Sequence, residues 1–110
     1  MDKRIKIIIK SLLSDCEKSL KLSLVAYHSK MDAARVQVYM SEAYTCIKVL
    51  HLIEAMYDGE ELDELDDFIK EFSIIHNELL ENIAHNSSIS SSLVEFNDLK
   101  ATCKTLKEKI

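Results

Sequence analysis

The stretch from Val36 to Met56, VQVYMSEAYTCIKVLHLIEAM, decides the fold because its apolar residues fall on two sides of a helix. At about 100° per residue, one broad apolar stripe is formed by Val36, Tyr39, Met40, Ala43, Cys46, Ile47, Leu50 and Ile53. A second stripe lies nearly opposite and is formed by Val38, Val49, Leu52 and Met56. A helix that is apolar on two faces must be covered on two faces. We therefore expect either that neighbouring helices of the chain wrap this helix, or that its second stripe is left for a partner.

Three further segments have apolar residues at helical spacing, so the sequence predicts an all-α protein. The 110 residues include no proline and one glycine, whereas sheet-rich domains of this size use both in their tight turns. We expect helices at residues 3–28, 32–57, 60–84 and 92–109. Because short loops make consecutive helices antiparallel neighbours, residues 1–110 are predicted to form one domain, an antiparallel up-down-up-down four-helix bundle.

Capping residues mark the expected helix ends. Three pairs with capping-box spacing accompany the second, third and fourth helices: Ser29 and Asp32, Asp58 and Glu61, and Ser92 and Glu95. Gly59 suits the left-handed position that follows a helix end. The polar run HNSSISSS, residues 85–92, is predicted to be a loop.

Charge is distributed unevenly along the chain. The formal net charge of −5 disfavours a nucleic-acid binder, which normally has a basic excess. Residues 1–30 carry seven basic and three acidic side chains, whereas residues 58–82 carry one basic and ten acidic side chains. We expect these two segments to attract each other within the chain, and the alternative is that the acidic segment steers a basic partner.

The compartment is predicted from the cysteines and from the lengths of the apolar runs. Three cysteines, Cys16, Cys46 and Cys103, lie on apolar stripes without close pairing, which is typical of a reducing compartment. No run approaches the roughly 20 apolar residues of a membrane span. We expect a cytoplasmic protein that does not bind a membrane.

No spacing typical of catalysis or metal binding is present. The residues three positions before the four histidines are not glutamates, and the HExxH and CxxC motifs are absent. We therefore expect no enzymatic activity, no cofactor and no metal. His76 lies on the core stripe of the third helix and is predicted to be a hydrogen-bonded core histidine.

The second stripe of the central helix is the main candidate for function. Its residues Val38, Val49, Leu52 and Met56 have the spacing of a helix–helix seam or of a groove that accepts an amphipathic segment. Three interpretations stay open: packing within the bundle, a homodimer seam, and a groove for a helical segment of another protein. The predicted partner-binding residues are these four together with Asp63, Glu64 and Asp67, which belong to an acidic rim at residues 60–67.

The predicted order and lengths of the helices resemble those of the flagellar export chaperone family FliS. The segment LLSDCEKSLKLSLVAY, residues 12–27, is similar to an early helix of that family, and Ala43, Ile47 and Leu50 are similar to a pattern in its second helix. Leu65, Phe68 and Ile69 in LDDFI resemble a later family segment. The resemblance implies a cytoplasmic export chaperone or adaptor that holds a helical client segment in an apolar groove.

A small acidic inhibitor is the alternative function. An immunity protein, an antitoxin or a viral antagonist would use the acidic residues to cover a basic site on its partner. Binding would then weaken steeply with salt and would depend on Asp63, Glu64 and Asp67 more than on Leu52.

Overall fold

The computed structural model describes residues 3–30, 32–57 and 63–110 of the chain. These residues form four α-helices and, within the described ranges, no β-strand. The helices are α1 (Lys3–Lys30), α2 (Ala33–Met56), α3 (Asp63–Ala84) and α4 (Ser90–Lys109). The prediction of an all-α protein with four helices is therefore confirmed.

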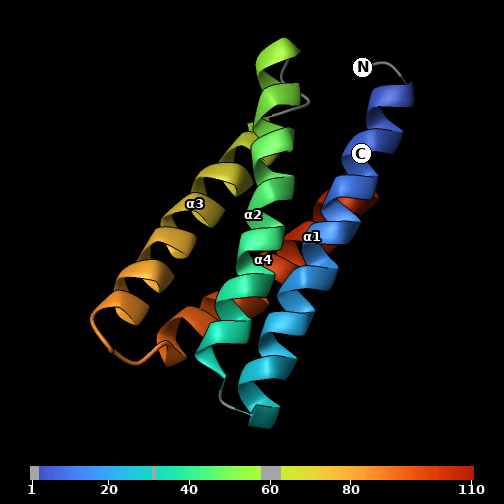
Figure 1. Cartoon of the computed structure of the whole chain (residues 1–110). Helices are drawn as coiled ribbons and strands as arrows, with labels where there is room; N and C mark the ends of the chain where they lie inside the picture. The colour runs from blue at the N-terminus through green and yellow to red at the C-terminus, as the bar shows by residue number, and fades with distance from the viewer. Residues whose placement is uncertain (1–2, 31, 58–62) are drawn as a thin grey trace.

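Each helix packs against two others. Figure 1 shows α1 beside α2, with α3 on the other side of α2 and α4 crossing behind α1 and α2. The contacts between elements join α1 to α2 and α4, and join α3 to α2 and α4. The helix α1 is therefore the diagonal neighbour of α3, so the basic first segment and the acidic third helix are not packed side by side.

The start of α2 is fixed by Asp32. Its backbone is extended, at φ −92° and ψ 92°, and its Oδ1 accepts a hydrogen bond from the Arg35 amide at 3.1 Å. This is an N-cap that satisfies an amide left free in the first helical turn. Ser29, expected to share a capping box with Asp32, instead donates its hydroxyl hydrogen to the Val25 carbonyl oxygen at 2.6 Å. Ser29 therefore belongs to the end of α1 and does not cap the start of α2.

The turn between α3 and α4 ends earlier than predicted, because α4 already begins at Ser90. Asn86 has a positive φ of 55°, the Ser87 amide donates to the Asn82 carbonyl at 2.7 Å, and the Asn86 amide donates to Ile83 at 3.2 Å. This pair of bonds is a Schellman motif, which ends α3. The expected capping box of Ser92 and Glu95 is wrong, because α4 begins at Ser90 and Ser92 is buried inside it.

The earlier start of α4 follows from Ile89. Its side chain is buried, and its carbonyl oxygen accepts the first helical hydrogen bond, from Leu93 at 3.2 Å. Burial of this one apolar residue in the serine-rich run therefore brings the following serines into the helix. The predicted capping and turn residues Asp58, Gly59 and Glu61, and the predicted start of the third helix at residue 60, lie outside the described residues.

One hydrophobic core receives side chains from all four helices. Its largest fully buried members are Phe68, Phe72, Phe96, Ile9, Leu13, Leu20, Met40, Ile47, Leu50, Leu65, Leu79 and Leu99. Cys16 and Cys103 are buried in the same core, Cys46 is half-buried, and all three are free thiols. A hydrogen bond with Cys103, and then burial, raises the pKa of the Cys16 thiol. Among the described helices none is long and apolar enough to cross a membrane.

Candidate protein-binding site

The four residues of the second stripe on α2 all lie on the surface. Their side chains are exposed to 57% at Val38, 38% at Val49, 63% at Leu52 and 77% at Met56. The neighbours α1 and α3 cover only the first stripe, from which Val36, Met40, Ala43, Ile47 and Leu50 are buried. The interpretation in which the second stripe packs within the bundle is therefore wrong. We call these four exposed residues the α2 stripe.

Leu52 also lines a groove between α2 and α3. The groove has a volume of about 750 Å³, within the range typical of binding clefts. It is lined by Tyr44, Ile47, Lys48, His51 and Leu52 of α2 and by Asp66, Ile69, Lys70, Ser73 and Ile74 of α3. Ile74 is itself 59% exposed. We call this feature the α2/α3 groove, and it extends the exposed apolar surface from α2 onto α3.

The structure brings together only part of the predicted set. Val38, Val49 and Met56 are not among the lining residues of the groove, whereas Leu52 belongs to both features. At a rise of about 1.5 Å per residue, the α2 stripe extends for roughly 27 Å from Val38 to Met56. Exposed Ser41, Glu42 and Thr45 lie between Val38 and Val49, so the apolar positions that follow one another at helical spacing are Val49, Leu52 and Met56.

Charged groups stand at fixed places within the groove. The Lys48 ammonium lies 5.1 Å from the centre of the Tyr44 ring, in a cation–π contact. The Lys70 ammonium lies 2.7 Å from Asp66 Oδ2, one helical turn away on α3. These contacts hold the cationic side chains against the groove walls, so its floor at Ile47 and Ile69 stays apolar.

A pair of carboxyl groups joins α2 to α3 at one end of the groove. Burial, followed by the hydrogen bond to Asp66 and the charge of Asp66, raises the pKa of Glu54 to about 6. The hydrogen bond from Lys70, and then that from Glu54, lowers the pKa of Asp66. Protonated Glu54 therefore donates to the Asp66 carboxylate, and ionisation of Glu54 replaces this bond with repulsion between two negative charges.

His76 is a core residue, as predicted, but it is not hydrogen-bonded within the described part of the chain. Its ring stacks on Tyr44, with the two centroids 4.4 Å apart and the planes 13° from parallel. It is 6% exposed, and neither ring nitrogen has a hydrogen-bond partner there. Burial, and then the nearby charge of Lys48, lowers the pKa of His76. The neutral form of the imidazole is thus favoured.

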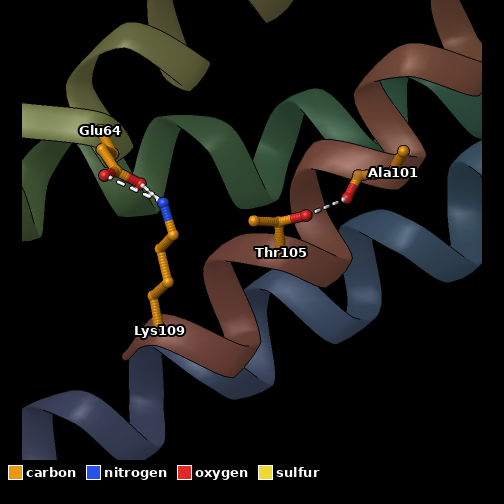
Figure 2. A network of polar contacts seen from close by, with 4 residues as sticks. All are labelled: Glu64, Ala101, Thr105 and Lys109. Atoms are coloured by element: carbon orange, nitrogen blue, oxygen red, sulfur yellow. Dashed lines mark hydrogen bonds and ion pairs between the residues drawn. The ribbon is translucent and has the colours of Figure 1, made fainter.

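The three predicted acidic residues are exposed in the first turns of α3. Glu64 is not free, because both of its oxygens accept hydrogen bonds from the Lys109 ammonium of α4, at 3.1 and 2.9 Å. Figure 2 shows this contact beside the bond from the Thr105 hydroxyl to the Ala101 carbonyl oxygen, 3.1 Å long. Residues 60–62 of the predicted rim lie outside the described ranges. Asp63 and Asp67 are therefore the better candidates for contact with a partner.

Sequence reasoning missed the apolar residues on the α3 side of the groove. The signal that would have found them is Ile74, which lies between the apolar positions Phe72 and Ile75, both buried, and therefore points away from the core face of α3. An isoleucine off the core stripe on one helix, facing the same side as an apolar stripe on the next, marks a shared exposed surface.

The described residues contain no group of three His, Cys, Asp or Glu side chains placed to hold a metal ion. Comparison of the chain with protein-family models, with curated proteins and with solved structures gives no match.

Proposed function

We propose that this chain is a non-enzymatic protein-binding helical bundle, which holds an amphipathic helical segment of a partner against the α2 stripe and the α2/α3 groove. The observation that carries the proposal is the exposure of four apolar side chains along one face of α2, beside a groove that continues onto Ile74. Exposed apolar surface is typical of interaction sites, and the helical spacing of Val49, Leu52 and Met56 matches that of a docked helix.

The acidic residues of α3 determine the chemistry of the partner segment. Asp63 and Asp67 are exposed next to the groove residue Asp66, and α3 contains seven acidic residues and one basic residue. A helix with an apolar face and lysine or arginine along one edge would complement this surface. Met56, the most exposed residue of the stripe, suits adaptable packing against such a helix because its side chain is flexible.

The finer architecture and the setting are part of the same proposal. Tyr44 meets His76 and Glu54 meets Asp66, so residues later on α2 contact residues earlier on α3. This order supports an antiparallel up-down-up-down bundle. The resemblance to FliS makes a cytoplasmic export chaperone or adaptor the form of protein binding that we propose.

The test is affinity capture with the wild-type chain, Leu52→Asp and the matched control Val94→Asp. Val94 is 66% exposed on α4, so its replacement adds the same charge at a comparable exposed site. We expect one partner to be captured by the wild type and by Val94→Asp and lost with Leu52→Asp. Equal capture by all three proteins would refute a role for the α2 stripe, and recovery of the chain alone as a dimer would make the stripe a homodimer seam.

A small acidic inhibitor is the second candidate, and the exposed carboxylates at Asp63 and Asp67 favour it. In that case the partner would be released by raising the salt concentration and would still be captured by Leu52→Asp. Charge reversal at Asp63, Glu64 and Asp67 would abolish its capture.

A further inference from the structure

A cleft between α1 and α4 is separate from the surface proposed above. It consists of two adjoining hollows that share Lys21 and Lys100. The first has a volume of about 400 Å³ and is lined by Ser14, Glu17, Lys18, Lys21 and Lys100. The second has a volume of about 500 Å³ and continues past Leu24, Val25 and His28 on α1 and Asn97 on α4. We call the two hollows together the α1/α4 cleft.

The first hollow has a positive charge that the described residues do not neutralise. No ion pair between described residues involves Lys18, Lys21 or Lys100. The one carboxylate in the lining, Glu17, is bound by the Lys107 ammonium at 2.5 Å. Three lysine side chains therefore line one hollow in a chain whose net charge is −5. Such a concentration of one sign of charge in a cleft attracts an anion.

The second hollow has a different character. Leu24 is buried at its base, Val25 is 53% exposed, and the His28 ring and the Asn97 amide are on its lining. The Ser29 hydroxyl is already occupied, because it donates to the Val25 carbonyl oxygen. An apolar or aromatic group would cover Val25 here while an attached anion lay among the lysines.

We propose that the α1/α4 cleft binds a small phosphate monoester, with the phosphate group among Lys18, Lys21 and Lys100 and the organic group over Val25. A phosphate monoester has a charge between −1.5 and −2 near pH 7 and three acceptor oxygens, so it engages several ammonium groups at once. A carboxylate has one charge and would leave two of the three lysines without a counter-charge. Lysine binds phosphate as a point charge and needs no fixed donor geometry.

The test is a titration of the full chain with phenyl phosphate at low salt, in which binding is measured through the backbone amide chemical shifts. Inorganic phosphate and phenol are titrated separately. We expect phenyl phosphate to shift amides at residues 14–28 and 97–100 and to bind at least tenfold more tightly than either part alone. Equal binding of phenyl phosphate and inorganic phosphate would overturn the proposed role of Val25, and shifts elsewhere would overturn the site.

Paired variants separate the cleft from general charge. Lys21→Glu with Lys100→Glu should reduce the affinity at least tenfold, whereas Lys10→Glu with Lys104→Glu should leave it within twofold. The control pair also changes one exposed lysine on α1 and one on α4, but neither residue lines the cleft. If the first double variant unfolds at a lower temperature than the wild type, Lys21→Gln with Lys100→Gln replaces it. The expected loss of affinity is the same. An equal loss in test and control pairs would overturn the proposal.

A last measurement distinguishes a free phosphate monoester from a lipid headgroup. The chain is mixed with vesicles of phosphatidylcholine that contain phosphatidic acid, and phenyl phosphate is added as a competitor. Competition at the lysines would support the phosphate chemistry of the cleft. Binding to the vesicles without any binding of phenyl phosphate would overturn the assignment of a small soluble ligand.

Discussion

Leu50 and Leu52 lie two residues apart on α2, and Leu50 is fully buried whereas Leu52 is 63% exposed. The two leucines point to opposite sides of the helix because two residues correspond to about 200° of rotation. One belongs to the core and the other to the α2 stripe. The pair therefore places one core residue and one residue of the proposed binding surface within a single turn of the same helix.

Alanine substitution at these two leucines should have very different effects on stability. We expect Leu50→Ala to lower the free energy of unfolding by about 2–5 kcal/mol, because it removes buried contacts and leaves a cavity. Leu52→Ala should change it by less than about 0.5 kcal/mol. Urea unfolding followed by circular dichroism measures both. A large loss for Leu52→Ala would mean that this side chain is buried in solution, and the α2 stripe would then not be a free surface.

Glu54 should make stability depend on pH between about 4.5 and 6. Its pKa is raised from 4.5 to about 6, so the folded chain holds this proton more tightly than the unfolded chain. The stabilisation is present in full below about pH 4.5 and is lost as the pH rises through about 6. The pKa of Asp66 is lowered from 3.8, so its own contribution is lost only as the pH falls below that range.

The variant Glu54→Gln isolates this effect, because the amide donates to Asp66 at every pH. We expect the stability of the wild type relative to the variant to fall between pH 4.5 and pH 6 and to stay constant above it. A difference that is flat across this range would contradict the carboxyl pair between α2 and α3.

His76→Phe should preserve or raise stability. Phenylalanine keeps the stacking on Tyr44 and removes two buried nitrogens that have no hydrogen-bond partner in the described structure. We expect a gain on the order of 1 kcal/mol at pH 7. Because the pKa of His76 is lowered from 6.5, the wild type should also lose stability relative to the variant as the pH falls below 6.5.

The control is Phe72→Ala, one turn earlier on the same helix. It should lower the free energy of unfolding by about 3–5 kcal/mol. A cost of that size for His76→Phe would show instead that the imidazole nitrogens have polar partners in solution.

The two ion pairs made by α4 should differ in strength. Glu17 and Lys107 are 2.5 Å apart, with side chains 28% and 27% exposed, whereas Glu64 and Lys109 are 2.9 Å apart and more than half exposed. We expect Glu17→Gln to lower the free energy of unfolding by about 1–2 kcal/mol, because Lys107 would lose its charged partner at a half-buried site. Glu64→Gln should cost less than about 0.5 kcal/mol. Equal costs in thermal unfolding at two salt concentrations would contradict the difference in burial.

The sequence predicted the helices and most of the core because apolar spacing determines which residues a helix buries. In α1, Leu13 is fully buried and its neighbour Leu12 is partly buried, although the two point to different sides of the helix. The reason is that α1 has two neighbours, α2 and α4, which widen its buried arc. A single-helix pattern does not contain this information, because it depends on where the other helices lie.

The apolar part of the candidate site was predicted only on its α2 side. Periodicity within α2 identified Val38, Val49, Leu52 and Met56 as a separate face, and the structure shows that face exposed. Ile74 and Lys70 reach the groove through the packing of α3 on α2, which brings together residues about 20 positions apart. The missing hydrogen bonds of His76 also depend on tertiary neighbours, so helical spacing indicated its burial and not its partners.

Site-specific photo-cross-linking at position 52 tests the protein-binding proposal most directly. A photoreactive phenylalanine analogue replaces Leu52 in the full chain, and a matched chain carries it at Val25, which is exposed to 53% on α1. We expect position 52 to cross-link, in cells of the source organism, to a helical segment of one other protein, and position 25 not to cross-link to it. Cross-linking of the same partner from both positions, or no partner at position 52, would contradict the proposal that the α2 stripe is the binding surface.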